Sequence, residues 1–208
     1  MKMGFIEDYT KLMVERIPTN RHWLESVAVN VFNTILGTSV RADTKLGRLN
    51  TNLFFMCIGP SGIAHKSVPL KYYAIPTLTD YGQRIEEYIN KGVQDKKLWT
   101  KVRPIMPSRF SVEGMIEYLA KEQSQGIAIR DEFSSLFKER SKSYIADILG
   151  FLSELYDGVI QKRYTKSYKL EEPKNVCVNL LAATTPYIYS IMDLSFLFKE
   201  QEIGYYTI

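Results

Sequence analysis

The chain has 208 residues, of which 45% are hydrophobic and 24% charged, and its formal net charge is +4. These totals are typical of a globular protein long enough for one α/β domain with a sizeable core. They exclude a low-complexity chain and leave no apolar run long enough to span a bilayer, while the mild positive charge permits nucleic-acid binding without requiring it.

Both cysteines, Cys57 and Cys177, lie in apolar stretches typical of strands. We interpret them as small core residues in a reducing compartment, and not as a disulfide or metal framework. The N-terminal stretch carries acidic residues early and lacks a secretory apolar core. We therefore expect a cytoplasmic protein without membrane contact.

Apolar residues at helical spacing predict two N-terminal helices, over residues 5–17 and 21–36. We expect these helices, within residues 1–37, to pack on a core formed by residues 38–208, so that the whole is a single domain. Residues 38–52 are polar and predict a short hairpin or loop. Its cations are either a solvated surface or a contact to nucleic acid or a neighbouring subunit; they are Arg41, Lys45 and Arg48.

The next stretch, residues 53–67, is an apolar run that stops at Gly59 and continues as a loop ending in Lys66 and Ser67. A buried strand that leads through such a loop into a helix is the pattern of a phosphate-binding loop. Lys66 would reach the β- and γ-phosphates, and Ser67 would hold Mg²⁺. The predicted nucleotide-binding residues are Gly59, Pro60, Ser61, Gly62, Ile63, Ala64, His65, Lys66 and Ser67.

This loop departs from the usual G-x-x-x-x-G-K-[ST] pattern at two points. His65 stands where the pattern has glycine, and the loop is one residue longer. The alternative is an ordinary strand-turn-helix junction with a lysine in the first turn of the helix. After it we expect separate helices over 68–75 and 80–90, a charged connection over 94–103, and a helix capped by Ser111.

The segment Gly126–Phe133, GIAIRDEF, is a short apolar strand followed by two carboxylates. This is the Walker B pattern, in which the first acid organises the Mg²⁺ and the second polarises the attacking water. Those roles fall on Asp131 and Glu132. A carboxylate pair at a strand end also arises by chance, but here it follows a phosphate-loop candidate on its own buried strand.

An amphipathic helix is expected over 143–156, and a basic, tyrosine-bearing segment follows it. That segment is either a nucleic-acid contact, with bases stacked on tyrosine, or an exposed hairpin whose lysines prevent edge pairing. Its candidate nucleic-acid residues are Lys162, Arg163, Tyr164 and Lys166. A third buried strand, over 175–183, ends at Thr184 and Thr185, either of which is a candidate γ-phosphate sensor.

Together these pieces resemble the RecA-like P-loop ATPases encoded by phages, plasmids, archaeal viruses and integrated elements, often associated with primases. The resemblance covers most of the chain, from Trp23 to about Gly204. It rests on GPSGIAHKS, IAIRDEF, FLSELYDG and LLAATTP in that order. It implies a mostly parallel sheet between helices, of the RecA/AAA+ type, with the site at the carboxyl ends of the strands.

The resemblance also implies an Mg²⁺-dependent ATPase that remodels or translocates single- or double-stranded DNA, helicase-like, in replication of a mobile element or virus. Lys66, Glu132 and Thr184 would be its catalytic residues, and Ser67 and Asp131 would hold the metal. Such proteins usually work as rings in which an arginine finger from one subunit enters the next subunit's site, so a homo-oligomeric ring such as a hexamer is the expected assembly. No arginine follows Arg163 here, so fast turnover is in doubt. The alternatives are a degenerate nucleotide-binding or DNA-binding module and a genome-packaging ATPase.

Overall fold

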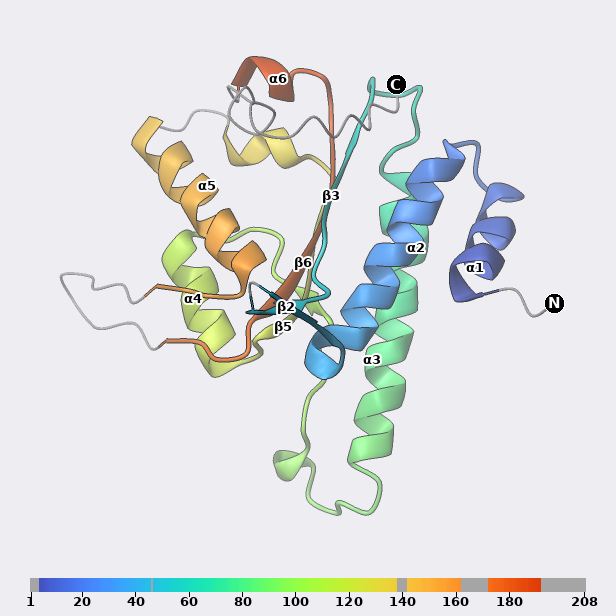
Figure 1. Ribbon diagram of the computed structural model, residues 1–208. Coiled ribbons are helices and arrows are strands. Elements are labelled where there is room, and N and C mark those ends of the chain that lie inside the picture. Colours follow the sequence, from blue (N-terminus) through green and yellow to red (C-terminus); the bar gives the residue numbers. More distant parts are fainter. Residues whose placement is uncertain (1–3, 46, 138–141, 162–171, 192–208) are drawn as a thin grey trace.

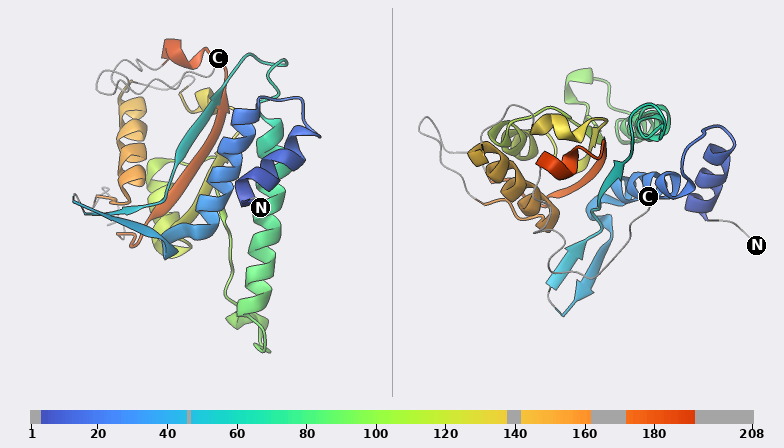
Figure 2. Two further views of the ribbon diagram at one scale, coloured as in Figure 1. Left: turned by 45° about the vertical axis from the view of Figure 1, so that its right-hand side comes forward. Right: turned by 90° about the horizontal axis from the view of Figure 1, so that it is seen from above.

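The computed structural model describes residues 4–45, 47–137, 142–161 and 172–191. Its core is a four-stranded parallel sheet with helices on both faces, which confirms the predicted α/β class (Figures 1 and 2). The strands are β3 (Phe54–Ile58), β4 (Ile105–Met106), β5 (Gln125–Arg130) and β6 (Cys177–Thr184). The helices are α1 (Phe5–Val14), α2 (Arg21–Leu36), α3 (Ile75–Ile89), α4 (Val112–Lys121), α5 (Lys142–Asp157) and the short α6 (Ile188–Ile191).

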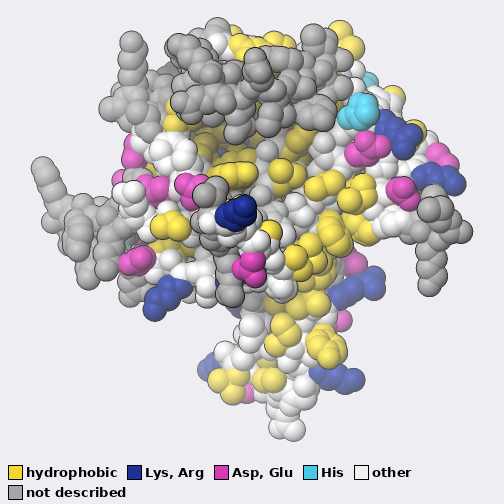
Figure 3. All heavy atoms as spheres, in the orientation of Figure 1, with side chains coloured by type: hydrophobic (Ala, Val, Ile, Leu, Met, Phe, Trp, Pro, Cys, Tyr) yellow, Lys and Arg dark blue, Asp and Glu magenta, His cyan; other side chains and the backbone are white. Residues whose placement is uncertain are grey.

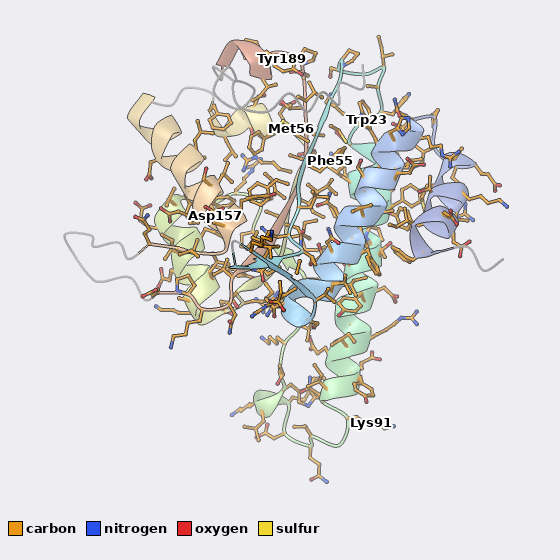
Figure 4. All side chains as sticks on the ribbon, viewed as in Figure 1. Trp23, Phe55, Met56, Lys91, Asp157 and Tyr189 are labelled. Atoms are coloured by element: carbon orange, nitrogen blue, oxygen red, sulfur yellow. The ribbon has the colours of Figure 1, made fainter. Side chains whose placement is uncertain are left out.

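Successive side chains along each strand point to opposite faces of the sheet, so the sheet has one hydrophobic core on each face. Leu181 and Ala183 pack with α2, α3 and the outer helix α1, whereas Leu180 and Ala182 pack with α4 and α5. All eight residues of β6 are buried, because helices cover both of its faces and strands flank both of its edges. The labelled neighbours Phe55 and Met56 of β3 pack against opposite cores in the same way (Figure 4).

The strand order is β3–β6–β5–β4, so the last strand in the sequence lies between the first and the third. Ile58 pairs with Thr184, and Arg130 pairs with Ala182. Because all the strands are parallel, the segments that follow β3, β5 and β6 emerge at the same edge of the sheet, at the top of Figure 1.

The polar segment after α2 forms the antiparallel hairpin of β1 (Arg41–Thr44) and β2 (Gly47–Asn50), as expected. Every residue of β1 is exposed, and the hairpin projects from the body in the view from above (Figure 2). Both cysteines are buried and free, which confirms their prediction as core residues.

One expectation about the elements was wrong, and one strand was missed. The two helices expected after the loop form one continuous helical rod, in which the π-helical segment η2 (Leu70–Ala74) runs directly into α3. Pro76 does not break the rod, because it lies in the first turn of α3, where a missing N–H costs little. The sequence also did not reveal β4, because its two residues are too few to show a strand period.

The cap expected at Ser111 is present, since its hydroxyl accepts a hydrogen bond of 3.1 Å from the Gly114 N–H. Three short 3₁₀ segments complete the described connections: η1 (Gly37–Ser39), η3 (Lys96–Leu98) and η4 (Phe133–Leu136). Among the helices that the structure describes, none combines the length and the apolar character needed to cross a membrane.

Candidate functional site

Three segments that are far apart in the sequence meet at the carboxyl edge of the sheet. The loop over 59–67 follows β3, the pair Asp131–Glu132 follows β5, and Thr184 ends β6. A backbone hydrogen bond links the first segment to the third, since the Gly59 N–H donates to the Thr184 carbonyl oxygen at 3.1 Å. The sequence-predicted residues therefore gather at the expected edge of the sheet.

Close packing and unusual backbone angles shape the loop. A Cβ on Gly59 would lie 2.8 Å from both the Trp23 ring and the Ala64 side chain, so no larger residue fits there. Trp23 comes from the amino end of α2, near the loop in Figure 4. The Thr19 hydroxyl also donates to the Ala64 carbonyl at 3.1 Å, so the N-terminal helices brace the loop from outside.

His65 has a positive φ of 46°, in the left-handed region that favours glycine. This is the position where the common phosphate-loop pattern has glycine. Its side chain is exposed, and none of the described hydrogen bonds involves its imidazole. Gly62 also has a positive φ, of 78°. The departure at His65 therefore changes the residue type while the chain still adopts a glycine-like turn.

The loop offers hydrogen-bond donors. The backbone N–H groups of residues 61–67 donate to no acceptor within the described part of the chain. The helical rod begins immediately afterwards at Val68, so its first-turn N–H groups face the same end. Such an arrangement suits an anion, because free N–H groups and the helix macrodipole both favour negative charge.

Lys66 is buried, with only 7% of its surface exposed. It forms no hydrogen bond or ion pair with any residue that the structure describes, Asp131 and Glu132 included. A charged amine in this situation favours an anionic partner, because burial without one is costly. Its charge lies close enough to Cys57 to oppose the effect of burial, which raises the pKa of that thiol to about 12.

Glu132 and Thr184 are in direct contact. The Thr184 hydroxyl donates a 3.1 Å hydrogen bond to Oε1 of Glu132, and the Ser134 hydroxyl donates to the same oxygen. Thr184 and Ser134 are both buried, whereas Glu132 is partly exposed. The two hydroxyls hold one carboxylate oxygen in place and leave the other, Oε2, without a described partner. A carboxylate held in this way is positioned to polarise a water molecule.

Asp131 has a different partner from the one expected. It forms an ion pair with Lys71, in which Nζ lies 2.5 Å from Oδ2, and both side chains are about half exposed. The hydrogen bond from Lys71 holds the pKa of Asp131 below its usual value, and the same bond raises the pKa of Lys71. Asp131 is thus a carboxylate at neutral pH, but a lysine ammonium occupies one of its oxygens.

Sequence reasoning missed Lys71 and Ser134. Lys71 lies one helical turn after Ser67, and its N–H donates to the Ser67 carbonyl at 3.0 Å. That spacing places a second cation near the first turn of the helix and was visible in the sequence. Ser134 could not be recognised, because its role depends on the chain turning back into η4 after Glu132.

Of the two threonines left open as sensors, Thr184 contacts the carboxylate. Thr185 instead uses its backbone carbonyl, which accepts a 3.0 Å hydrogen bond from the Ile188 N–H at the start of α6. The candidate nucleic-acid residues Lys162, Arg163, Tyr164 and Lys166 lie outside the described residues. Ser67 is half-buried at the start of the rod, where its hydroxyl has no described partner.

Two cavities lie away from this edge. One, of about 710 Å³, opens at the amino ends of the strands near Gln125, and the other, of about 460 Å³, is apolar and lies between β3 and α5. In the described part of the chain, no three His, Cys, Asp or Glu side chains gather as a metal site would require. A Mg²⁺ site needs no such cluster, because Mg²⁺ is usually held by one or two carboxylates, water and substrate phosphates.

Comparison with protein-family models and with curated proteins finds no match to this chain.

Proposed function

We propose that the protein is an Mg²⁺-dependent P-loop ATPase that couples hydrolysis to remodelling or translocation of nucleic acid. One observation carries the proposal. The phosphate-loop candidate, the Asp131–Glu132 pair and Thr184 come together at one edge of a parallel sheet, where Thr184 holds Glu132. In α/β sheets of this kind, ligands bind outside the carboxyl ends of the strands.

The residues present fit a nucleoside triphosphate with Mg²⁺. The free N–H groups of residues 61–67 and the start of the helical rod would hold phosphate oxygens, and Lys66 would neutralise their charge. Ser67 and Asp131 would hold the metal, which supplies charge stabilisation at the transferring phosphoryl group. Glu132 would accept a proton from the attacking water through Oε2, while Thr184 keeps the carboxylate oriented.

The Lys71–Asp131 ion pair gives this proposal a specific feature. Metal binding at Asp131 would compete with Lys71 for the carboxylate, and the ammonium can move away because both side chains are half exposed. The released ammonium would then lie close to the phosphates, one turn beyond Ser67. Exchange of one cation for another at Asp131 would thus accompany nucleotide binding.

The experiment compares the wild type with Lys66→Ala and Glu132→Gln by phosphate release and by thermal shift with ATP and Mg²⁺. Bound ATP should stabilise the wild type by RT ln(1 + [L]/Kd), about 2.7 kcal/mol at one hundred times Kd. Lys66→Ala should lose the shift and the hydrolysis. Glu132→Gln should keep the shift and lose about 10²–10⁴-fold in rate, because it removes the base alone.

Matched controls are Lys11→Ala and Glu15→Gln, which change exposed residues in and just after α1. Equal activity in all five proteins would refute the catalytic assignment, and so would the absence of a thermal shift in the wild type at millimolar ATP.

A second candidate function is a nucleotide-binding module with little catalysis. The ion pair of Lys71 with Asp131 favours it, because the predicted metal ligand is already neutralised. The same experiment separates the two candidates. A nucleotide-dependent thermal shift in the wild type with no phosphate release above that of Glu132→Gln would select the binding module.

A further inference from the structure

The far end of α3 and the connection that follows it, residues 88–103, form a protruding arm that we call the basic arm. It extends from the bottom of the molecule, at the opposite end of the helical rod from the loop over 59–67 (Figure 1). At about 1.5 Å per residue, the rod from Val68 to Ile89 separates the two ends by roughly 30 Å. The arm is thus distinct from the candidate ATP site.

The charge of the arm accounts for that of the whole protein. It carries five basic residues and one acidic residue, for a net charge of +4, and the formal net charge of the entire chain is also +4. The rest of the chain is therefore neutral overall. The basic residues are all exposed and form no ion pair with any described residue; they are Lys91, Lys96, Lys97, Lys101 and Arg103.

Specific contacts hold the arm in a defined shape. The side chain of Asn90, which is buried, donates to the carbonyls of Glu86 and Thr100 and accepts from the Thr100 N–H, each at 2.8 Å. The Trp99 indole donates to the Val93 carbonyl at 3.2 Å, and the Lys96 ammonium lies 5.7 Å from the Trp99 ring. These contacts join the two legs of the arm and set the positions of the cations.

The basic arm also carries exposed aromatic and aliphatic side chains beside its cations. The Tyr88 side chain is 78% exposed and that of Leu98 is 73% exposed, both among the most exposed large hydrophobic residues described. Lysine and hydrophobic side chains are interspersed over the arm in Figure 3, and Lys91 projects from it in Figure 4. Cations beside an exposed aromatic ring suit a strand whose phosphates pair with lysine and whose bases stack on tyrosine.

We propose that the basic arm is a binding surface for the phosphate backbone of nucleic acid. An anionic membrane is the less suitable partner, because the tip between the two legs, residues 92–95, is Gly-Val-Gln-Asp, and the exposed Tyr88 and Leu98 lie on the legs and not at the tip. The cations instead line both legs, as a track of phosphates requires. The proposed function supplies the reason why the protein would bind nucleic acid, and the basic arm is the surface that would make the contact.

The test uses the full chain without nucleotide and a fluorescein-labelled oligonucleotide of mixed sequence, single-stranded and as a duplex. Anisotropy gives the affinity as salt is varied from about 0.05 to about 0.2 M. The double variant Lys91→Ala/Lys97→Ala should weaken binding about tenfold per lost contact at 0.1 M salt. Its salt slope should be shallower by about 0.7 per contact for the single strand and 0.9 for the duplex.

The matched control is Lys11→Ala/Arg16→Ala, which removes the same charge from exposed positions at α1. Tyr88→Ala should lower the affinity for the single strand about tenfold and leave the affinity for the duplex unchanged, because stacking needs unpaired bases. An equal loss in arm and control variants would overturn the proposal, since net charge alone would then explain binding. Arm-dependent binding to phosphatidylserine vesicles with no oligonucleotide binding would overturn it in favour of a membrane.

Thermal shift with ATP separates this proposal from the proposed function. Both double variants should keep the ATP shift of the wild type, because the arm lies at the far end of the rod and the control removes only exposed side chains outside residues 59–67. If the protein binds oligonucleotide through the arm but shows no thermal shift with ATP, the proposed ATPase function is refuted and the proposed nucleic-acid surface stands. If ATP shifts the melting temperature but oligonucleotide binding does not depend on the arm, the proposed nucleic-acid surface is refuted and the proposed ATPase function stands.

Discussion

Lys71 and Asp131 form an ion pair in which Nζ lies 2.5 Å from Oδ2, linking the helical rod after the loop to the end of β5. The contact ties the helix that follows the loop to the carboxylate pair. It also places a cation where the proposed chemistry needs a metal, so the two compete for the same carboxylate.

Replacing Lys71 with Met should therefore lower the Mg²⁺ concentration needed for half-maximal thermal stabilisation by ATP. A partly exposed pair contributes about 0.2–1 kcal/mol, which corresponds to a change of up to about fivefold. A Mg²⁺ titration at fixed ATP measures this, with Lys11→Met as the control for lost charge. An unchanged Mg²⁺ requirement would mean that Asp131 does not hold the metal.

The same pair predicts a pH dependence of folding stability. Hydrogen bonding to Lys71 lowers the pKa of Asp131, so its stabilisation is present above the ordinary value of 3.8 and is lost as pH falls through the lowered one. At neutral pH, urea unfolding should show the wild type more stable than Lys71→Met by about 0.2–1 kcal/mol. Well below pH 3.8 the difference should vanish, and a constant difference would contradict the ion-pair origin.

Thr184 should act as a positioning residue for Glu132. Thr184→Val keeps the shape but removes the hydroxyl that donates to Oε1, so we expect kcat to fall about tenfold with the KM for ATP unchanged. Thr184→Ser restores the donor and should recover most of the rate. Steady-state phosphate release measures both variants. A parallel loss in the valine and serine variants would indicate a packing role instead.

His65 should matter through its backbone and not through its imidazole. A positive φ costs a non-glycine residue about 1–2 kcal/mol, and β-branched residues adopt it least readily. His65→Gly and His65→Asn should keep ATP binding and stability, whereas His65→Val should be less stable than His65→Gly by about 1 kcal/mol or more. Urea unfolding and thermal shift report both effects. Loss of ATP binding in both the glycine and the asparagine variants would assign a role to the imidazole.

The two thiols should be unreactive in the folded protein. Burial raises the pKa of Cys57 to about 12 and also raises that of Cys177, so neither forms much thiolate at neutral pH. A colorimetric thiol reagent should label neither cysteine in buffer and both in denaturant. Rapid labelling without denaturant would show that the core around β3 and β6 opens easily.

Local sequence was sufficient for much of this protein. The helix over 21–36 and the cap at Ser111 were predicted correctly, because both depend on residues within a few positions of one another. The apolar runs that became β3, β5 and β6 were recognisable for the same reason. The polar ends of those runs identified the loop, the carboxylate pair and Thr184 as candidates before any of them could be placed in space.

The partners of these groups depended on contacts between distant segments. Thr184 meets Glu132 only because β6 lies between β3 and β5, and strand order is not encoded in any local period. Lys71 reaches Asp131 only because the π-helical turn that carries it lies beside the end of β5, although the two residues are far apart in the sequence. Residue type and spacing thus determined which chemistry was available. Tertiary packing decided which side chains share a hydrogen bond or a charge, because those interactions act over a few ångströms between residues tens of positions apart.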